Sequence, residues 1–270
     1  YDYYMPESYI PSRDLYIEKE LDINDEIDKL RHSATCSLFE RRDTIVVASV
    51  SCIYGLCAPG DYYKMSLSVR PGDQISMREV IRNLVDIQYK RNDMDFARGT
   101  FRVRGDIIEV YPASYSEHAI RISFWGDEVE EVSEIDVVTG NTVAKLLHTI
   151  VFPATHYVVE GITMENALVN IKHDMEIESQ AFLDQNKLVE GQRLRQRVSY
   201  DMEMLQEVGY CSGIENYSRY FDGREPGQPP YTLIDYFPED FITFIDESHM
   251  TIPQIRGMYN GDRARKNNLV

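Results

Sequence analysis

The chain lacks a phosphate-binding loop. No segment of its 270 residues matches Gly-x-x-x-x-Gly-Lys-Ser/Thr, the loop whose backbone N–H groups hold nucleotide phosphates. It also lacks an apolar run as long as a membrane span and a basic, apolar leader at its first residues. These absences predict a cytosolic protein that has no membrane segment and does not hydrolyse ATP by itself.

Cysteine and positive charge are scarce. The four cysteines show no Cys-x-x-Cys spacing and are too few for a disulfide scaffold, so we expect reduced thiols. Lysine and arginine number 28 against 45 aspartates and glutamates, which gives a net charge of −17. Because phosphate neutralisation supplies most non-specific affinity for DNA, this charge excludes binding by bulk electrostatics. Any contact with nucleic acid must be local.

Residues 241–250 combine a short apolar run with two successive carboxylates, Asp246 and Glu247. In P-loop motor ATPases a buried parallel strand ends in such a pair, where the Asp holds Mg²⁺ and the Glu polarises the attacking water. His249 completes an Asp-Glu-x-His pattern that resembles motif II of superfamily 2 helicases. The alternative is a buried strand that ends in a solvated acidic turn.

The first residues are rich in both tyrosine and acid. Residues 1–28 hold nine acidic side chains and two bases, Arg13 and Lys19. The candidate DNA-binding residues here are Tyr1, Tyr3, Tyr4, Tyr9, Tyr16 and Lys19. An aromatic hairpin in an acidic surround would stack on a base that has left its helix and would repel ordinary duplex. The alternative is that these tyrosines pack in a core or an interface.

Periodicity predicts the order of elements along the chain. Residues 24–42 are expected to form an amphipathic helix with Ile27, Leu30, Ala34 and Leu38 on its apolar stripe, and residues 44–50 a buried parallel strand. Ser76 and Glu79 form a capping box that opens another helix. Alternating runs separated by Gly-Asp at 105–106 and 126–127 predict an antiparallel sheet, and residues 164–208 a helical hairpin broken near 186–191.

A group of arginines marks the predicted sheet. Arg98, Arg102 and Arg104 share one parity of a strand, so their guanidinium groups are expected on one exposed face, with Arg91 just upstream. On an acidic chain, such a face suits an acidic protein partner. The alternative is a solvated basic surface without a partner.

Six blocks of sequence occur in the order found in one known family. They are residues 1–11, 24–34, 211–219, 231–238, the motif at Asp246, and 257–266. Together they resemble the UvrB family, the damage-verifying subunits of bacterial nucleotide excision repair. The family's amino-terminal P-loop, second motor domain and carboxyl-terminal helical hairpin find no counterpart here, so we expect an internal piece of a longer protein.

The resemblance implies an α/β fold. Its parts would be a partial P-loop (RecA-like) helicase motor domain with a projecting β-hairpin, an inserted α+β domain and a helical subdomain. The implied boundaries are a tyrosine-rich hairpin (1–23), a motor segment (24–63), an inserted UvrA-binding domain (64–156), a helical subdomain (157–222) and a second motor segment with the Asp-Glu-Ser-His motif (223–270).

The resemblance also implies a function, namely recognition and verification of damaged DNA by a subunit that UvrA loads and that recruits UvrC. ATP and Mg²⁺ are the family's cofactors, with Asp246 on the metal, although neither is expected to bind this fragment tightly. Arg91, Arg98, Arg102 and Arg104 match the positions of UvrA-contacting arginines. An alternative is a non-enzymatic UvrA-binding module related to the transcription-repair coupling factor. The tyrosine-rich segment and the Asp246 motif argue against that alternative.

Overall fold

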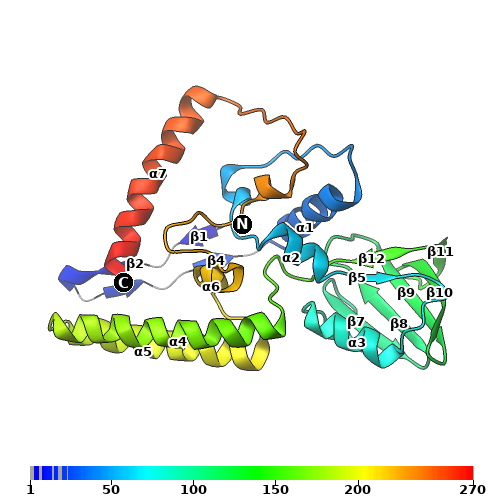
Figure 1. Ribbon diagram of the computed structural model, residues 1–270. Helices are drawn as coiled ribbons and strands as arrows, with labels where there is room; N and C mark the ends of the chain where they lie inside the picture. Colours follow the sequence, from blue (N-terminus) through cyan, green and yellow to red (C-terminus); the bar gives the residue numbers. More distant parts are fainter. Residues whose placement is uncertain (1–2, 6–7, 14, 18–19, 23, 270) are drawn as a thin grey trace. The chain divides into compact units, whose positions relative to one another are not determined.

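The computed structural model describes residues 3–5, 8–13, 15–17, 20–22 and 24–269 (Figure 1). They fall into two compact units. The sheet unit comprises Lys29–Ile171 and Asp201–Phe237, and the hairpin unit comprises Tyr1–Asp28, Lys172–Tyr200 and Pro238–Val270. Within the described residues, no helix is both long and apolar enough to cross a membrane.

Six strands form the main sheet of the sheet unit. Their spatial order is β11 (Thr142–Leu146), β10 (Glu128–Asp136), β9 (His118–Trp125), β8 (Ile107–Tyr111), β7 (Thr100–Arg104) and β6 (Lys90–Arg91). Every pair is antiparallel except β6 with β7. Gly105 and Gly126 open the two-residue turns with φ of 60° and 64°, a conformation that glycine adopts without steric cost. The predicted antiparallel sheet is confirmed.

Helix α3 (Met77–Asp86) covers one face of this sheet (Figure 1). The Ser76 side chain accepts a hydrogen bond from the Glu79 backbone N–H at 3.2 Å, which confirms the predicted cap. Val80 and Leu84 are fully buried and pack against apolar residues of β7 to β10. Strands β5 (Leu67–Val69) and β12 (Thr149–Val151) pair with each other where the chain enters and leaves the sheet.

A stack of aromatic rings joins distant segments of the sheet unit. Tyr62, on α2 (Pro59–Lys64), has its ring centroid 6.0 Å from Phe39, 5.9 Å from Phe152 and 6.0 Å from Tyr236. Phe39 lies near the end of α1 (Asp25–Glu40), and Tyr236 lies in a 3₁₀ helix at Leu233–Tyr236. Tyr62 itself is completely buried. Phe152 and Tyr236 are buried as well, whereas Phe39 is partly buried, so the four rings form a shared apolar cluster.

The predicted helix at 24–42 is confirmed as α1, but its predicted apolar stripe is wrong at Leu30, while Ile27, Ala34 and Leu38 are partly buried. Leu30 remains 57% exposed, and the buried face instead carries His32, Thr35 and Cys36. The reason lies outside the helix, because the rings that α1 meets in the sheet unit approach it from this more polar side. Periodicity alone ranks side chains by hydrophobicity and does not locate their partners.

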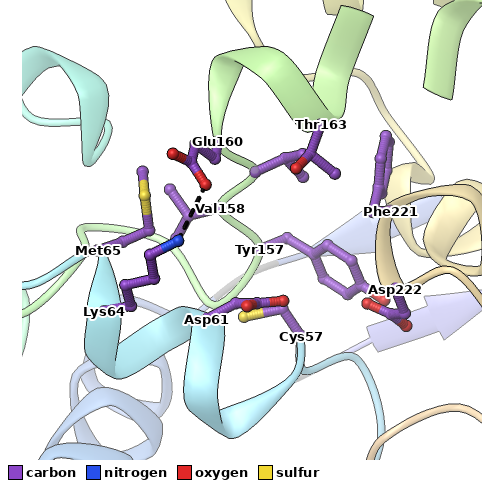
Figure 2. Close-up of a pocket in the computed structure, with 11 residues that line it drawn as sticks. Cys57, Asp61, Lys64, Met65, Tyr157, Val158, Glu160, Thr163, Phe221 and Asp222 are labelled. Atoms are coloured by element: carbon purple, nitrogen blue, oxygen red, sulfur yellow. Dashed lines mark hydrogen bonds and ion pairs between the residues drawn. The ribbon is translucent and has the colours of Figure 1, made fainter. Parts of the chain in front are cut away.

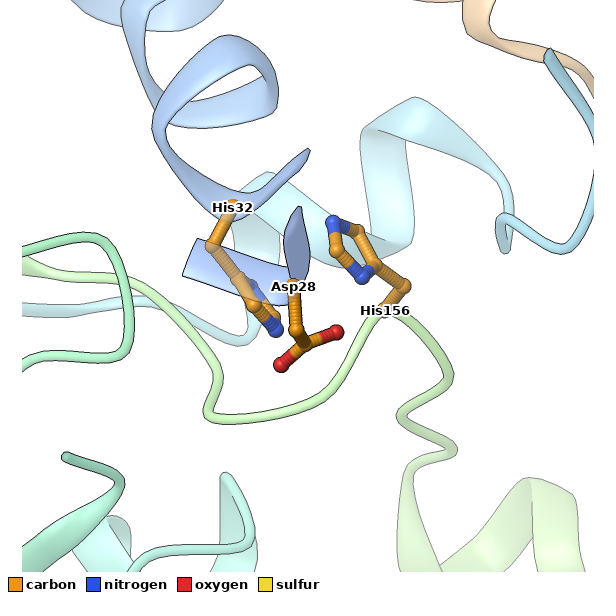
Figure 3. Close-up of side chains that lie close together, drawn as sticks. All are labelled: Asp28, His32 and His156. Carbon is orange, nitrogen blue, oxygen red and sulfur yellow. The ribbon is translucent and has the colours of Figure 1, made fainter. Parts of the chain in front are cut away.

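His32 and His156 form a buried pair on this face of α1 (Figure 3). Their ring centroids are 3.9 Å apart with an interplanar angle of 18°, and Nε2 of His156 lies 3.4 Å from the Thr35 hydroxyl. Burial lowers the pKa of His156 well below its ordinary range, and the neighbouring His32 and Arg31 add to this effect. His156 is therefore neutral at pH 7.

Among its described residues, the hairpin unit contains four short strands, the first turn of α1, parts of α4 (Gly161–Asp184) and α5 (Leu188–Val208), and α7 (Ser248–Leu269). Helix α4 turns at residues 185–187 into α5, which confirms the predicted helical hairpin (Figure 1). Gly191 permits the close approach of the two helices. A Cβ atom there would lie 3.1 Å from the Ser179 carbonyl oxygen and 3.3 Å from the Phe182 Cβ.

The two buried parallel strands predicted at 44–50 and 241–245 are not formed. Both segments are irregular, and their apolar side chains are open to water, with Val47 95% and Phe244 91% exposed. Neither segment pairs with a strand of the described residues. A parallel strand needs neighbours on its edges and layers on its faces, so apolar sequence without these partners stays irregular. The predicted motor-domain sheet is absent from the part of the chain that is described.

We expect His156 to make stability depend on pH. Below pH of about 6.5 the unfolded chain binds a proton that the folded chain excludes, so stability is lost as pH falls. Between pH 7.5 and 5.5 the unaltered chain should lose about 1 kcal/mol more free energy of unfolding than His156→Phe, which keeps a stacking ring. Urea denaturation at the two pH values measures this. Equal losses in both proteins would contradict the assignment.

Candidate functional site

The tyrosine-rich segment forms two antiparallel strand pairs. β1 (Tyr3–Met5) pairs with β4 (Glu20–Asp22), and β2 (Ser8–Ile10) pairs with β3 (Leu15–Ile17). Tyr9 lies directly opposite Tyr16, next to the 3₁₀ turn at Pro11–Arg13. The β1–β4 pair, which contains Tyr3 and Tyr4, is farther from this turn in sequence. Tyr1 and Lys19 lie outside the described residues.

The Asp-Glu-x-His motif lies at the start of α7 rather than at the end of a strand. The Asp246 carboxylate accepts a hydrogen bond from the Glu247 backbone N–H at 3.0 Å, and the Asp246 carbonyl accepts one from the Thr251 hydroxyl at 3.0 Å. Nδ1 of His249 lies 3.3 Å from a Glu247 carboxylate oxygen. Glu247 has a φ of 45°, a left-handed conformation that is strained for a residue with a Cβ.

These residues fit part of a nucleotide–metal site. Mg²⁺ is held in such sites by one or two carboxylates together with phosphate oxygens, and Asp246 and Glu247 are exposed neighbours able to supply carboxylate oxygens. The sequence supplies no glycine-rich loop to hold the phosphates. What the structure shows of the motif is two adjacent, exposed carboxylates.

The four candidate arginines occupy different environments. Arg91, on β6, is paired with Asp93 through Nε at 3.0 Å. Arg104, the last residue of β7, is exposed and makes no ion pair with a described residue. Arg98 precedes β7 and is partly buried.

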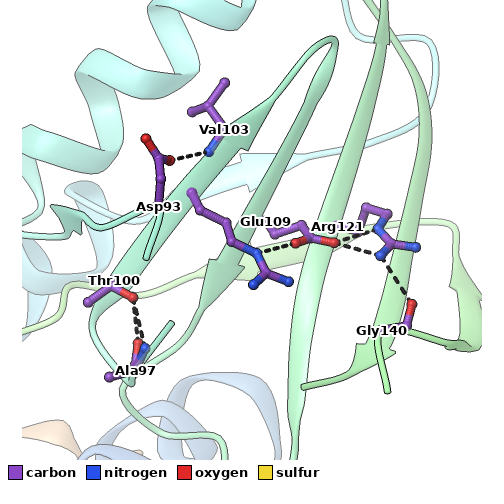
Figure 4. Close-up of polar contacts among 8 residues, drawn as sticks. Asp93, Ala97, Thr100, Val103, Glu109, Arg121 and Gly140 are labelled. Atoms are coloured by element: carbon purple, nitrogen blue, oxygen red, sulfur yellow. Dashed lines mark hydrogen bonds and ion pairs between the residues drawn. The ribbon is translucent and has the colours of Figure 1, made fainter. Parts of the chain in front are cut away.

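Arg102 does not lie on an open face. Its Nε donates to Oε2 of Glu109 at 2.5 Å, and its side chain is only 16% exposed. Glu109 also accepts through Oε1 from Nε of Arg121 at 2.8 Å and from Nη2 at 2.6 Å (Figure 4). Arg121 donates in addition to the Gly140 carbonyl at 3.1 Å. The prediction that Arg98, Arg102 and Arg104 stand exposed on one strand is wrong for Arg102, and Arg98 precedes the strand and is only partly exposed.

Glu109 is the residue that sequence reasoning missed. Burial opposes its ionisation, but hydrogen bonds from Arg121 and Arg102 outweigh this effect and lower the pKa of the carboxyl below its ordinary range. The available signal was an acid at the centre of an otherwise apolar strand, Ile107–Tyr111. A buried acid needs a base, and the registers place Arg102 and Arg121 directly opposite it on the two neighbouring strands.

A small, partly open cavity lies elsewhere in the sheet unit (Figure 2). It measures about 40 Å³, and its lining includes Cys57, Tyr157 and Asp222. Burial raises the pKa of Asp222, although Arg224 pairs with this carboxylate at 2.9 Å. The volume is far below the several hundred cubic ångströms of a small-molecule site. This cavity is therefore too small to hold a small-molecule ligand.

We expect Arg102→Glu to destabilise the sheet unit, because it would set a second carboxylate against the buried Glu109. The free energy of unfolding should fall by about 3–5 kcal/mol. Arg104→Glu, on the same strand but exposed, should change it by no more than about 0.5 kcal/mol. Urea denaturation followed by circular dichroism compares the two variants. Similar stability of both would show that the Glu109 pairing contributes little.

Comparisons with known proteins give the same assignment for both central regions. Residues 67–157 match the model of the UvrB interaction domain, which includes the whole six-stranded sheet. Residues 162–223 match the model of the UvrB third helical domain, which includes most of α4 and all of α5.

Close relatives extend this similarity to the rest of the chain. UvrABC system protein B of Caldanaerobacter subterraneus subsp. tengcongensis is 60% identical over 270 residues, and that of Streptococcus pyogenes serotype M2 is 59% identical over the same length. All of this chain is covered, and it spans 41% of each relative. The resemblance seen in the six sequence blocks is confirmed. With two domain models and identity along its full length in agreement, the chain belongs to the UvrB family.

Proposed function

We propose that this chain is the part of a UvrB protein that meets UvrA and damaged DNA in nucleotide excision repair. The observation that carries the proposal is the 59–60% identity, over all 270 residues, to proteins named UvrABC system protein B. The match of residues 67–157 to the UvrB interaction domain supports a protein partner at the sheet. The same identity favours this function over the alternative of a coupling-factor module.

The partner surface that we propose lies at the β6–β7 edge of the sheet. Arg104 is exposed there without an ion pair to a described residue, and the Arg91–Asp93 pair is half exposed. On a chain with a net charge of −17, an exposed guanidinium is a local exception that steers an acidic partner to one place.

The paired strands at 3–22 are the proposed contact with DNA. Tyr9 and Tyr16 are register partners in the β2–β3 ladder, beside the turn. Each tyrosine offers an aromatic plane to an unstacked base, whereas the acidic residues around them repel intact duplex. This combination favours a strand that has already left its helix.

Asp246 and Glu247 are proposed to serve the ATP site of the intact protein. Bound Mg²⁺ would neutralise charge on the phosphates there, with Asp246 as its protein ligand and Glu247 directed at the attacking water. UvrC is the proposed later partner, which the UvrB–DNA complex recruits.

We expect the 270-residue chain to bind UvrA, and Arg104→Glu to weaken this binding about tenfold or more. Reversal of an exposed charge at a complementary interface costs affinity and slows association most at low salt. Biolayer interferometry at two salt concentrations measures both effects. Arg82→Glu is the matched control, since Arg82 is exposed on α3, which covers the opposite face of the sheet. No binding by the unaltered chain would overturn the proposed function.

In a full-length protein, Tyr9→Ala with Tyr16→Ala should impair damage-specific DNA complexes. Each lost stack removes about 1–3 kcal/mol, so the double substitution should lower affinity about a hundredfold or more. Gel shifts on matched damaged and undamaged duplexes measure this. Tyr200→Ala, at an exposed position on α5, is the control. Normal binding of damaged DNA by the double variant would assign the tyrosines a structural role.

A further inference from the structure

Arg102 is held in place by two contacts of different kinds. Its Nε donates to Glu109, and its Cζ lies 4.2 Å from the centroid of the Phe96 ring. The hydrogen bond fixes one edge of the guanidinium, and the ring fixes its plane. An arginine without such contacts samples many rotamers, so these two contacts remove side-chain freedom that Arg102 would otherwise lose on binding.

The terminal nitrogens of Arg102 remain available. Nη1 and Nη2 make no hydrogen bond to any residue that the structure describes, whereas Arg121 uses both Nε and Nη2. Two terminal N–H groups in one plane form a fork whose spacing matches the two oxygens of a carboxylate. The small exposed part of the side chain, 16%, limits access to a compact group.

The loop that carries Phe96 is itself fixed by hydrogen bonds. The Asn92 side chain accepts from the backbone N–H groups of Met94 at 3.2 Å and Asp95 at 3.0 Å. The Thr100 hydroxyl donates to the Ala97 carbonyl at 2.7 Å (Figure 4). Phe96 also packs near Tyr111, with ring centroids 5.5 Å apart. The ring is therefore a prepared platform for the guanidinium and not a loop side chain that settles only when a partner binds.

We propose that Phe96 and Glu109 are positioning residues, which hold the terminal fork of Arg102 ready for a carboxylate on the protein partner of this sheet. This inference rests on the proposed function, since it concerns how the same partner is recognised. A guanidinium that is already fixed loses less side-chain entropy on binding than a mobile one, so each hydrogen bond that it forms contributes more to the affinity.

A protein carboxylate suits this fork better than a nucleic-acid phosphate. Binding to a phosphate backbone draws its affinity from several cations acting together. Here Glu109 already neutralises part of the charge of Arg102 and Arg121, and Asp93 pairs with Arg91 nearby. Beside the exposed Arg104, the Arg102 fork is a directed pair of donors, and its geometry suits a single planar acceptor.

The test is a double-mutant cycle on binding of the 270-residue chain to UvrA. Phe96→Leu should lower affinity about fivefold to tenfold when Arg102 is present, because the platform for its guanidinium is lost. In an Arg102→Lys background, which keeps a cation for Glu109 but has no fork, the same change should lower affinity less than twofold. Phe96→Tyr, which keeps the ring, should bind as the unaltered chain does.

Controls separate this mechanism from a loss of folding. Tyr220→Leu removes another ring beneath a guanidinium, that of Arg219 at 4.6 Å, outside the interaction domain, and should leave affinity unchanged. Glu109→Gln should weaken binding in the Arg102 background more than in the Arg102→Lys background, with circular dichroism as the check on folding. Equal losses of affinity in the Arg102 and Arg102→Lys backgrounds, or a loss of affinity with Phe96→Tyr, would overturn this inference and leave the proposed function standing. If undamaged duplex DNA competed with UvrA for the Arg102 fork, the fork would bind phosphate, and the proposal of a carboxylate ligand would be wrong.

Discussion

The stack of rings around Tyr62 is the contact on which the sheet unit depends. It gathers Phe39 from α1, Phe152 from just after β12, and Tyr236 from the 3₁₀ helix near the end of the unit. Two hydroxyl groups lock this arrangement to the backbone, since Tyr89 donates to the Phe152 carbonyl and Tyr236 to the Cys57 carbonyl, each at 3.0 Å. Segments so distant in sequence meet only where burial of large rings offsets the entropy of closing the loops between them.

The interaction domain begins and ends at this stack. Tyr62 precedes β5 by a few residues, and Phe152 directly follows β12, so the β5–β12 pair continues from the ring cluster toward the sheet. Helix α3 then seals one sheet face, and the Glu109 cluster occupies the other. One sheet face is thus closed by apolar packing and the other is crossed by charges that are paired. The domain can present a few fixed polar groups because its own stability does not rely on the exposed ones.

Local patterns predicted much of this fold, and they failed where an element needs partners. Helix α3 was predictable because its cap and apolar spacing lie within a dozen residues, and the hairpins because Gly-Asp turns set their register. The segments at 44–50 and 241–245 have strand-like sequence but no neighbour to complete a ladder. Strand alternation correctly predicted that Arg102 and Phe101 lie on opposite faces of the sheet. Only the strand register shows that Glu109 is the cross-strand partner of Arg102. Parity assigns a face and does not report burial.

The acidic character of the chain gives these fixed arginines their significance. An exposed ion pair is worth only about 0–1 kcal/mol, because salt screens the two charges and both side chains lose rotational freedom when they pair. A guanidinium that is already stacked on a ring and hydrogen-bonded on one edge loses much of its side-chain entropy during folding, so it loses less on binding. Under the function proposed for this chain, a small number of oriented donors would give the domain its specificity for a protein partner. Orientation of single charges, not their number, is what this sheet offers to a partner.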